Sequence, residues 1–393
     1  MWVILMKSVR KVLLLACVPL ILPMTLTISA LRYELSPVPP RSQAVASAQA
    51  KIALDKSTVV PAPSPVKGIV ALSHSAEVLE IVVAPTENQF LVVTEFGQDK
   101  YGEPDAFGGF LYEVRMDKVR PVAREIVSGN NIVSKPSAVW NPDGTAAYYE
   151  YDDGKCPPIA NNSCGIFKLD AQTGKVEKVS SDSTQGLAIS PDGNLLAFWD
   201  YTTDDGLTVF DLKRNAIVNS WAGEVHAVDD SLLSDIAFAP DGKSVFALTY
   251  AGNETPLKQF DLQTRKVRTV SGNARSLAGV KDSVYFLQFT AAIADSTPAI
   301  SLMKIAPSDS SVEKVLDDFP YDTILVSGNG KWIVARGGDK GLAIYDTQGR
   351  ALRTAGPQCQ TAAVMPDDRV IYAVRGVLTT DLAACGEVQS KHH

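Results

Sequence analysis

The stretch of sequence that decides the fold runs from residue 187 to residue 199 and reads LAISPDGNLLAFW. Two short runs of mainly apolar residues flank a turn made of Pro191, Asp192 and Gly193. Proline presets φ at the first corner of a tight turn, aspartate caps the turn, and glycine adopts the positive φ that closes it. The flanking runs are too short for helices and are bounded by turn formers, so the stretch predicts a β-hairpin.

The same phrase is repeated along the chain at a constant spacing. The turn prolines of the three clearest copies are Pro142, Pro191 and Pro240, which are 49 residues apart. A third run follows each hairpin and ends in an aspartate, at Asp170, Asp211 and Asp261 respectively. A fourth run, with alternating polar and apolar residues, follows at 174–179 and at 265–270, which is typical of an outer strand with one solvated face. Four antiparallel strands in a repeat of roughly 40–50 residues form the unit of a β-propeller.

Weaker copies extend the repeat in both directions. They begin near residues 81, 284, 332 and 362, and the last of them lacks an outer strand. Residues 68–73 form a strand without a repeat of its own, and pairing it with the last copy closes the ring and removes the exposed edges. We therefore predict an all-β fold, a β-propeller of seven blades of four antiparallel strands closed by an N-terminal strand. Six or eight blades are the alternatives, because the fifth copy is poorly marked.

The N-terminal region is predicted to be a segment that targets the chain to a membrane. Lys7, Arg10 and Lys11 precede an uncharged stretch over residues 12–31, which as a helix would span about 30 Å, one hydrocarbon core. Basic residues on that side favour export of the rest of the chain. An uncleaved anchor, a cleaved signal peptide ending at Ala30 and a lipoprotein with Cys17 are the three interpretations, and all of them export the body.

The composition along the chain divides it into four parts. We predict a membrane anchor or signal segment over 1–35, a linker rich in Pro, Ala and Ser over 36–66, the β-propeller over 67–388, and a tail over 389–393.

The Pro-Asp-Gly phrases resemble the WD40-like repeats of TolB-type periplasmic β-propellers over about residues 68–385. The resemblance implies the architecture and a location outside the cytoplasm. It does not identify a ligand. Neither the N-terminal α/β domain of TolB nor the C-terminal hydrolase domain of prolyl-oligopeptidase-type propellers is expected, and full Gly-His…Trp-Asp signatures are missing.

Charge argues against nucleic acid as a partner. The formal net charge is −7, and four of the 37 basic residues lie in the first 32 positions, which hold no Asp or Glu, so the body is more acidic than the total. Affinity for nucleic acid comes mainly from neutralising phosphates, and no stripe of Lys and Arg is present.

Four cysteines in the body agree with export. Cys156, Cys164, Cys359 and Cys385 are an even number, which predicts disulfides, with Cys156–Cys164 and Cys359–Cys385 as the pairings local in sequence. Free buried thiols are the alternative, and the spacings do not fit a zinc site.

No catalytic residue and no metal ligand is predicted. His226 is the one histidine that could face a channel, and His74, His392 and His393 suggest no site. The acidic stretch over residues 200–206 resembles part of a calcium loop, but its sixth position is Asp205 where such loops require glycine, so an ordinary connecting loop is favoured. Glu103 and Asp105 lie in a polar insertion over residues 97–109 that could carry recognition.

These observations lead to two functional hypotheses. The first is a membrane-tethered propeller outside the cytoplasm, in the bacterial periplasm, that binds a protein partner of the cell envelope. The alternative is a propeller enzyme or enzyme subunit, lactonase-like or dehydrogenase-like, with a metal or cofactor in the channel. No cofactor is predicted, and a calcium ion in the channel belongs to the alternative.

Overall fold

The computed structural model describes residues 70–71, 76–86, 89–96, 106–115, 118–128, 137–150, 163–200, 206–224, 236–252, 254–280, 282–290, 299–306, 311–327, 330–337 and 340–386. All of them belong to the second of two compact units, Val60–His393. The predicted anchor, linker and tail lie outside the described residues. Among the described residues, none of the helical segments has the length and hydrophobicity of a membrane span.

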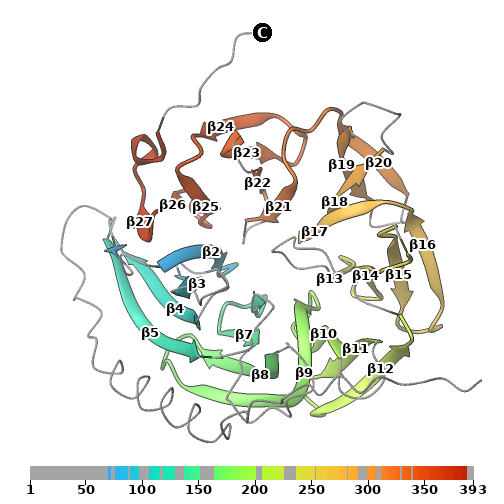
Figure 1. The fold of residues 1–393 in the computed structure, drawn as a ribbon. Coiled ribbons are helices and arrows are strands. Elements are labelled where there is room, and N and C mark those ends of the chain that lie inside the picture. Colours follow the sequence, from blue (N-terminus) through green and yellow to red (C-terminus); the bar gives the residue numbers. More distant parts are fainter. Residues whose placement is uncertain are drawn as a thin grey trace, which may run out of the picture. The chain divides into compact units, whose positions relative to one another are not determined.

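The strands form antiparallel sheets arranged in a ring, with the first strand of each repeat nearest the centre (Figure 1). The first sheet holds β2 (Ala76–Val83), β3 (Gln89–Phe96), β4 (Ala106–Arg115) and β5 (Lys118–Ser128). The next holds seven strands, β6 (Ala138–Trp140), β7 (Ala146–Glu150), β8 (Ser163–Asp170), β9 (Val176–Ile189), β10 (Leu195–Asp200), β11 (Gly206–Asp211) and β12 (Ala216–Ala222).

Four sheets complete the ring. The third holds β13 (Ile236–Phe238), β14 (Ser244–Leu248), β15 (Leu257–Asp261) and β16 (Val267–Ser271). The fourth holds β17 (Ala274–Val280), β18 (Ser283–Phe289), β19 (Ile300–Ile305) and β20 (Val312–Leu316). The fifth holds β21 (Thr323–Val326), β22 (Trp332–Arg336), β23 (Leu342–Asp346) and β24 (Ala351–Ala355). The sixth holds β25 (Cys359–Val364), β26 (Val370–Val374), β27 (Val377–Thr379) and β1 (Val70–Ala71), and a 3-10 helix, η3 (Leu382–Cys385), follows it.

The prediction of seven separate four-stranded blades is wrong, because the described strands form six sheets. The reason lies in β9, which serves two repeats without a break. Its first part pairs with β8 and its second part with β10, and Thr184 is paired with both Ser163 and Asp200. No proline or loop interrupts β9, and Gly186, with φ of 70°, lets the strand bulge instead of ending. The second and third copies of the repeat are therefore fused into one sheet.

The predicted closing strand is confirmed. β1 pairs antiparallel with β27, with Val70 opposite Leu378 and Ala71 opposite Val377. The N-terminal strand is thus the outer strand of a sheet whose other three strands come from the C-terminal end of the described chain, and this pairing joins the two ends of the ring.

The hydrogen bonds of the repeated phrase explain its sequence. In the copy at Pro191, the Gly193 N–H donates to the Ser190 carbonyl at 2.8 Å, and Gly193 has φ of 70°. The Asp192 carboxylate accepts the Ser190 hydroxyl at 2.6 Å and the Asn194 N–H at 3.1 Å. The side chain and the backbone therefore stabilise the same turn.

The aspartate that ends each third strand caps the turn that follows. Asp261 Oδ1 accepts the N–H groups of Gln263 at 3.0 Å and Thr264 at 2.6 Å, and hydrogen bonding from Thr264 lowers the pKa of this carboxyl. Asp170, Asp211 and Asp346 cap their turns in the same way. These carboxylates have a structural role.

The hydrophobic core lies between neighbouring repeats. Between the second and third copies, the apolar side chains come from both halves of the fused sheet; they are Tyr148, Ile166, Leu187, Leu196, Phe198 and Phe210. We call this interface the seam. A corresponding cluster joins the first and last sheets, with Phe90 and Ile371 among its members.

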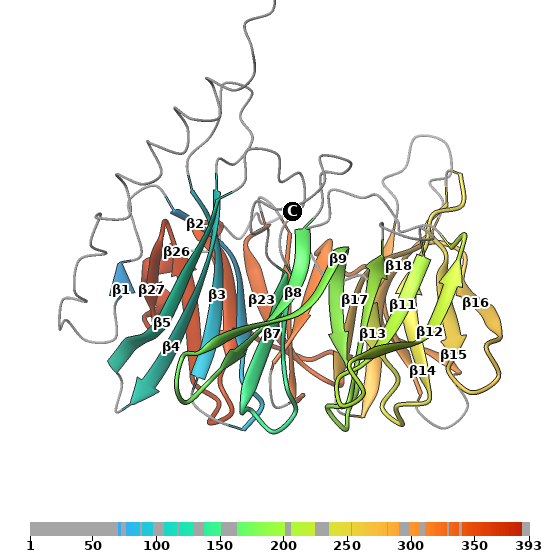
Figure 2. The ribbon, with the colours of Figure 1, turned by 90° about the horizontal axis from the view of Figure 1, so that it is seen from below.

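The two ends of the strands differ. The connections from first to second strands and from third to fourth strands are short turns, such as 141–145, 190–194 and 262–266, and they lie at one end, the turn end (lower side of Figure 2). The second and fourth strands end, and the first and third strands begin, at the opposite end, which we call the loop end. In sequence, the segments 97–105, 151–162, 201–205, 225–235 and 291–298 follow strands that end there, and these segments lie outside the described residues.

Gly206 tests the strand packing beside the seam. A Cβ atom on Gly206 would lie 2.3 Å from the backbone carbonyl oxygen of Trp221, so Gly206→Ala must push β11 away from β12. We expect the free energy of unfolding to fall by about 2 kcal/mol, as in other overpacked sites, in urea denaturation. Gly272→Ala is the control, because nothing lies within 4 Å of its Cβ position; equal losses in both variants would contradict this packing.

Candidate functional site

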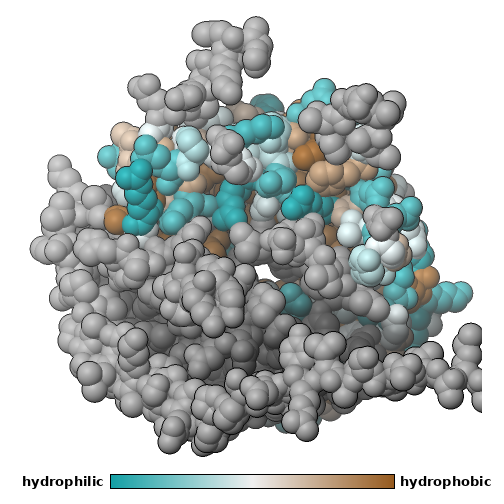
Figure 3. Space-filling model, viewed as in Figure 1, coloured by the Kyte–Doolittle hydropathy of each residue, from teal (hydrophilic) through white to brown (hydrophobic). Residues whose placement is uncertain are grey.

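A central opening is visible in the space-filling view (Figure 3). Four of the innermost strands carry a one-residue bulge in the part nearer the loop end, at Leu79, Gly186, Ser276 and Gln360. Bulges redirect side chains and are frequent beside functional sites, so this end of the ring is the first place to search.

Two of the bulged residues tie neighbouring sheets together. The Ser276 hydroxyl accepts the Ile324 N–H at 2.9 Å and lies 3.3 Å from the Ile324 carbonyl oxygen, to which it donates. The Gln360 side-chain oxygen accepts the Val78 N–H at 3.4 Å. These polar groups have structural partners, which leaves the seam as the remaining candidate.

The seam contains a carboxyl group where the other clear repeats have an apolar side chain. Glu150 lies eight residues after Pro142, and the residues eight after Pro191 and Pro240 are Trp199 and Leu248. Glu150 is two residues after Tyr148 on β7, so it faces the same side, towards the seam. Its side chain is 1% exposed. A core position between repeats is thus occupied by an ionisable group.

The groups that form hydrogen bonds with Glu150 are neutral. Its Oε2 atom accepts the Ser137 N–H at 2.9 Å. Burial raises the pKa of the Glu150 carboxyl to about 7, and the groups that oppose this rise most are neutral hydrogen-bond donors. They are the Ser137 backbone, the Thr184 hydroxyl, the Gly186 backbone and the Ser137 hydroxyl. The carboxyl therefore changes its protonation state near neutral pH.

Asp200 and Thr184 face the same interface. Asp200 is two residues after Phe198 on the regular strand β10, so both side chains point towards the seam. Thr184 is paired with Asp200 across the strands and therefore shares its face. Asp200 is 2% exposed and Thr184 is fully buried. The loop end of the seam thus holds two buried carboxyl groups and a buried hydroxyl.

This arrangement has two chemical uses. A buried carboxyl with a pKa near neutrality can donate or accept a proton. Carboxylate and hydroxyl oxygens are also the ligands that hard divalent cations prefer.

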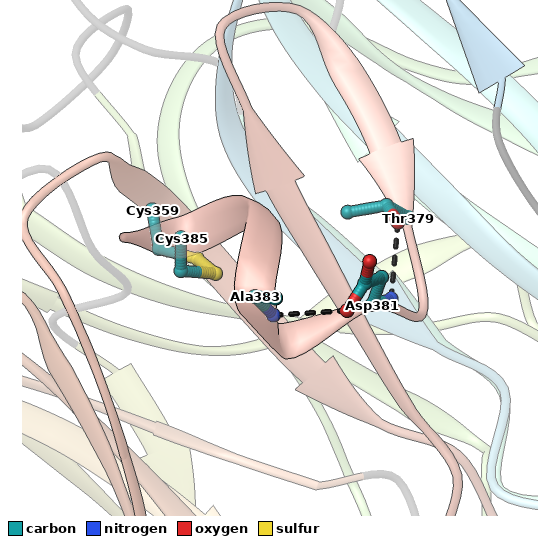
Figure 4. The surroundings of a disulfide bond; sticks show 5 residues. All are labelled: Cys359, Thr379, Asp381, Ala383 and Cys385. Carbon is teal, nitrogen blue, oxygen red and sulfur yellow. Dashed lines mark hydrogen bonds between the residues drawn. A yellow bond between two sulfur atoms is a disulfide. The ribbon is translucent and has the colours of Figure 1, made fainter. Parts of the chain in front are cut away.

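One predicted disulfide is confirmed and the other falls outside the described side chains. Cys359 at the start of β25 is bonded to Cys385 in η3, with the Cα atoms 4.9 Å apart (Figure 4). Asp381 begins η3 by accepting the Ala383 N–H at 2.9 Å, and its own N–H donates to the Thr379 hydroxyl at 3.0 Å. The disulfide fastens the end of the described chain to an innermost strand. The pairing of Cys156 with Cys164 stays a prediction.

Of the other residues that the sequence singled out, Asp200 belongs to the described site. His74, His226, His392, His393, Glu103 and Asp105 lie outside the described residues. The insertion predicted over 97–109 is shorter than expected, because β4 begins at Ala106. Of the acidic stretch 200–206, Asp200 and Gly206 belong to strands and 201–205 lies outside the described ranges.

The sequence motifs do not single out Glu150, because one glutamate after a predicted strand belongs to no catalytic or metal-binding pattern. Aligning the three Pro-Asp-Gly turns would have found it, since that alignment sets a glutamate beside Trp199 and Leu248.

The comparisons with known proteins identify the fold. No protein-family model matches the chain, and no curated protein matches its sequence. Hydrazine synthase from Kuenenia stuttgartiensis is similar in structure, with a TM-score of 0.50 and 14% identity over 83% of this chain and 99% of that one. An oligogalacturonate lyase from Vibrio parahaemolyticus has a TM-score of 0.50 and 12% identity over 80% of this chain and 92% of that one.

TolB from Acinetobacter baumannii is also similar, with a TM-score of 0.46 and 15% identity over 81% of this chain and 70% of that one. The described fold is an all-β propeller, which is the architecture that the resemblance in the sequence implied. Since 1020 solved chains match, the likeness shows the fold and leaves the ligand open.

Glu150→Gln tests the buried carboxyl through the pH dependence of stability. The pKa of Glu150 is about 7 in the folded chain against an ordinary value of 4.5, so the folded state binds this proton more tightly. In a buffer that contains a chelator of divalent cations, we expect the free energy of unfolding of the wild type to fall between about pH 4.5 and 7. Above that range it should level off. At pH 8 the variant should be more stable by on the order of 3 kcal/mol, which is the shift converted at 1.36 kcal/mol per pKa unit.

The measurement is urea denaturation at pH 5 and pH 8, with the exposed Glu313→Gln as the matched control. A wild type and a Glu150→Gln variant with the same pH dependence would contradict the assignment.

Removing the disulfide should destabilise the sixth sheet. The cysteines are 26 residues apart in sequence, and closing a loop of that length stabilises a fold by about 3 kcal/mol. We expect Cys359→Ala with Cys385→Ala to lose about that much in denaturant titration under oxidising conditions. A loss below about 1 kcal/mol would show that this crosslink contributes little to stability.

Proposed function

We propose that this chain is an exported propeller, held at the membrane by its N-terminal segment, that binds a protein partner of the cell envelope through its loop end. The partner is an envelope protein in the bacterial periplasm, and the membrane is contacted through residues 1–35.

The observation that carries the proposal is the difference between the two ends of the ring. At the turn end, short turns are capped by their own aspartates, as at Asp192 and Asp261. The strands that end at the loop end are followed in sequence by longer segments, of 9 residues at 97–105, 12 at 151–162 and 11 at 225–235. Loops placed on a rigid scaffold are where recognition usually occurs, so the loop end is the better candidate for the binding face.

Export is supported by the disulfide and by the N-terminal sequence. Cys359–Cys385 is a bond that persists in oxidising compartments. The uncharged stretch over residues 12–31, preceded by Lys7, Arg10 and Lys11, fits a segment that directs the body across a membrane.

A second candidate, a propeller enzyme or enzyme subunit, is favoured by one observation. Glu150 is buried, titrates near neutral pH and lies at the loop end, which is a property of catalytic acids and bases. Binding remains the first proposal because the seam is an interface between repeats, whereas catalysis needs access for a substrate.

Photo-crosslinking in intact envelopes tests which end binds. Tyr250 follows β14 at the loop end and is 50% exposed, and Lys243 lies in a turn at the turn end with an exposed side chain. A photoreactive phenylalanine analogue replaces each residue in the full-length chain. We expect a discrete adduct with a second protein from position 250 and none from position 243, read by gel and mass spectrometry.

An adduct from position 243 alone would place the binding face at the turn end and would contradict the proposal. Adducts of many masses from both positions would show random collision and would also contradict the proposal.

A further inference from the structure

The loop end of the seam has oxygen atoms that lack the partners their burial requires. Glu150 Oε1 and Thr184 Oγ1 are both buried, and neither has a hydrogen-bond partner of normal geometry among the described residues. The Thr184 hydroxyl is nevertheless close enough to lower the pKa of Glu150. Buried polar groups are nearly always satisfied by protein, water or an ion. These two oxygens therefore indicate a bound water molecule or ion beside them.

The sequence context makes a simple packing role a poor explanation. An apolar side chain fills this position in the next two repeats, as Trp199 and Leu248, so a hydrophobic residue would fit the architecture. Burying a carboxylate is costly unless it is paired or coordinates a metal. At the loop end of the seam this cost applies to the buried Glu150 carboxyl, and Asp200, which is also buried, adds a second carboxyl group next to Thr184.

No basic side chain of the described residues neutralises Glu150. The groups with the strongest effect on it are neutral. Lys168 is paired with Tyr148 and so shares the seam face, but it lies towards the turn end, where it lowers the pKa of Asp143 and Asp170. A positive charge beside Glu150 would therefore have to come from a bound ion or from outside the described residues.

We propose that the loop end of the seam binds a divalent cation of the calcium type, with the Glu150 and Asp200 carboxylates and the Thr184 hydroxyl as its ligands. The three side chains offer oxygen only, which selects a hard cation over one that prefers nitrogen or sulfur. The Ser137 N–H holds Glu150 Oε2 at 2.9 Å and so orients the carboxylate from the side opposite its free oxygen.

The ligands come from three strands, β7, β9 and β10, which belong to two repeats. Thr184 is also the residue at which β9 passes from pairing with β8 to pairing with β10. A cation bound there would connect the two halves of the fused sheet at the loop end of the seam. This site does not depend on the proposed partner, and its failure would leave partner binding untouched.

Calorimetric titration with calcium chloride tests the site, using the full-length chain in mild detergent after chelator treatment. We expect one equivalent of calcium to bind, and the melting temperature to rise by about 5 °C at a hundredfold excess over the Kd. Glu150→Gln and Asp200→Asn should each weaken binding by at least about tenfold, since affinity follows the number of charged ligands. Glu313→Gln and Asp282→Asn are exposed controls that should bind as the wild type does.

Thr184→Val is the variant that separates loss of the site from loss of the fold, because it keeps both carboxylates and nearly the same side-chain shape. Without calcium it should have the melting temperature of the wild type. It should bind calcium several-fold more weakly. Two results would overturn the proposal. One is the absence of stoichiometric binding of calcium, magnesium and manganese by the wild type. The other is unchanged binding by Glu150→Gln, which would place the cation elsewhere.

Discussion

Apolar packing between neighbouring repeats is the interaction on which the rest of this structure depends. Each repeat buries side chains against the next, as Leu187, Leu196 and Phe198 do against Tyr148 and Ile166. The ring exists because every repeat needs a neighbour on both faces, and the cluster that contains Phe90 and Ile371 supplies the contact between the first and last sheets. Hydrogen bonds between sheets, such as those of Ser276 and Gln360, fix the relative position of sheets whose packing is already favoured by apolar burial.

The fused sheet is the main departure from regular repetition. Because β9 continues through Thr184 and Gly186, the second and third repeats are joined by backbone hydrogen bonds as well as by side-chain packing. The same place carries Glu150, Asp200 and Thr184 within a buried interface. Local conflicts with the rules of core packing are expected at functional sites, where other interactions offset their cost. The seam is therefore where we look for function.

Much of the fold could be predicted from the sequence because its turns have a strong local chemistry. The Pro-Asp-Gly turns, the aspartates that end third strands and the closing strand follow from residues close together in the chain, and each is present. The number of sheets could not be predicted, because it depends on whether β9 stays paired on both sides of Thr184. The seam was missed for the same reason: Glu150 and Asp200 come together only through the pairing and facing of strands that lie 50 positions apart.

A crystal structure of the full-length chain grown with manganese, with anomalous scattering recorded, tests most directly whether the loop end of the seam binds a divalent cation. The account predicts one anomalous peak within coordination distance of the Glu150 and Asp200 carboxylates and the Thr184 hydroxyl. An ordered water in that position with no anomalous signal, or a Glu150 carboxyl that donates its proton to a neighbouring oxygen, would contradict it.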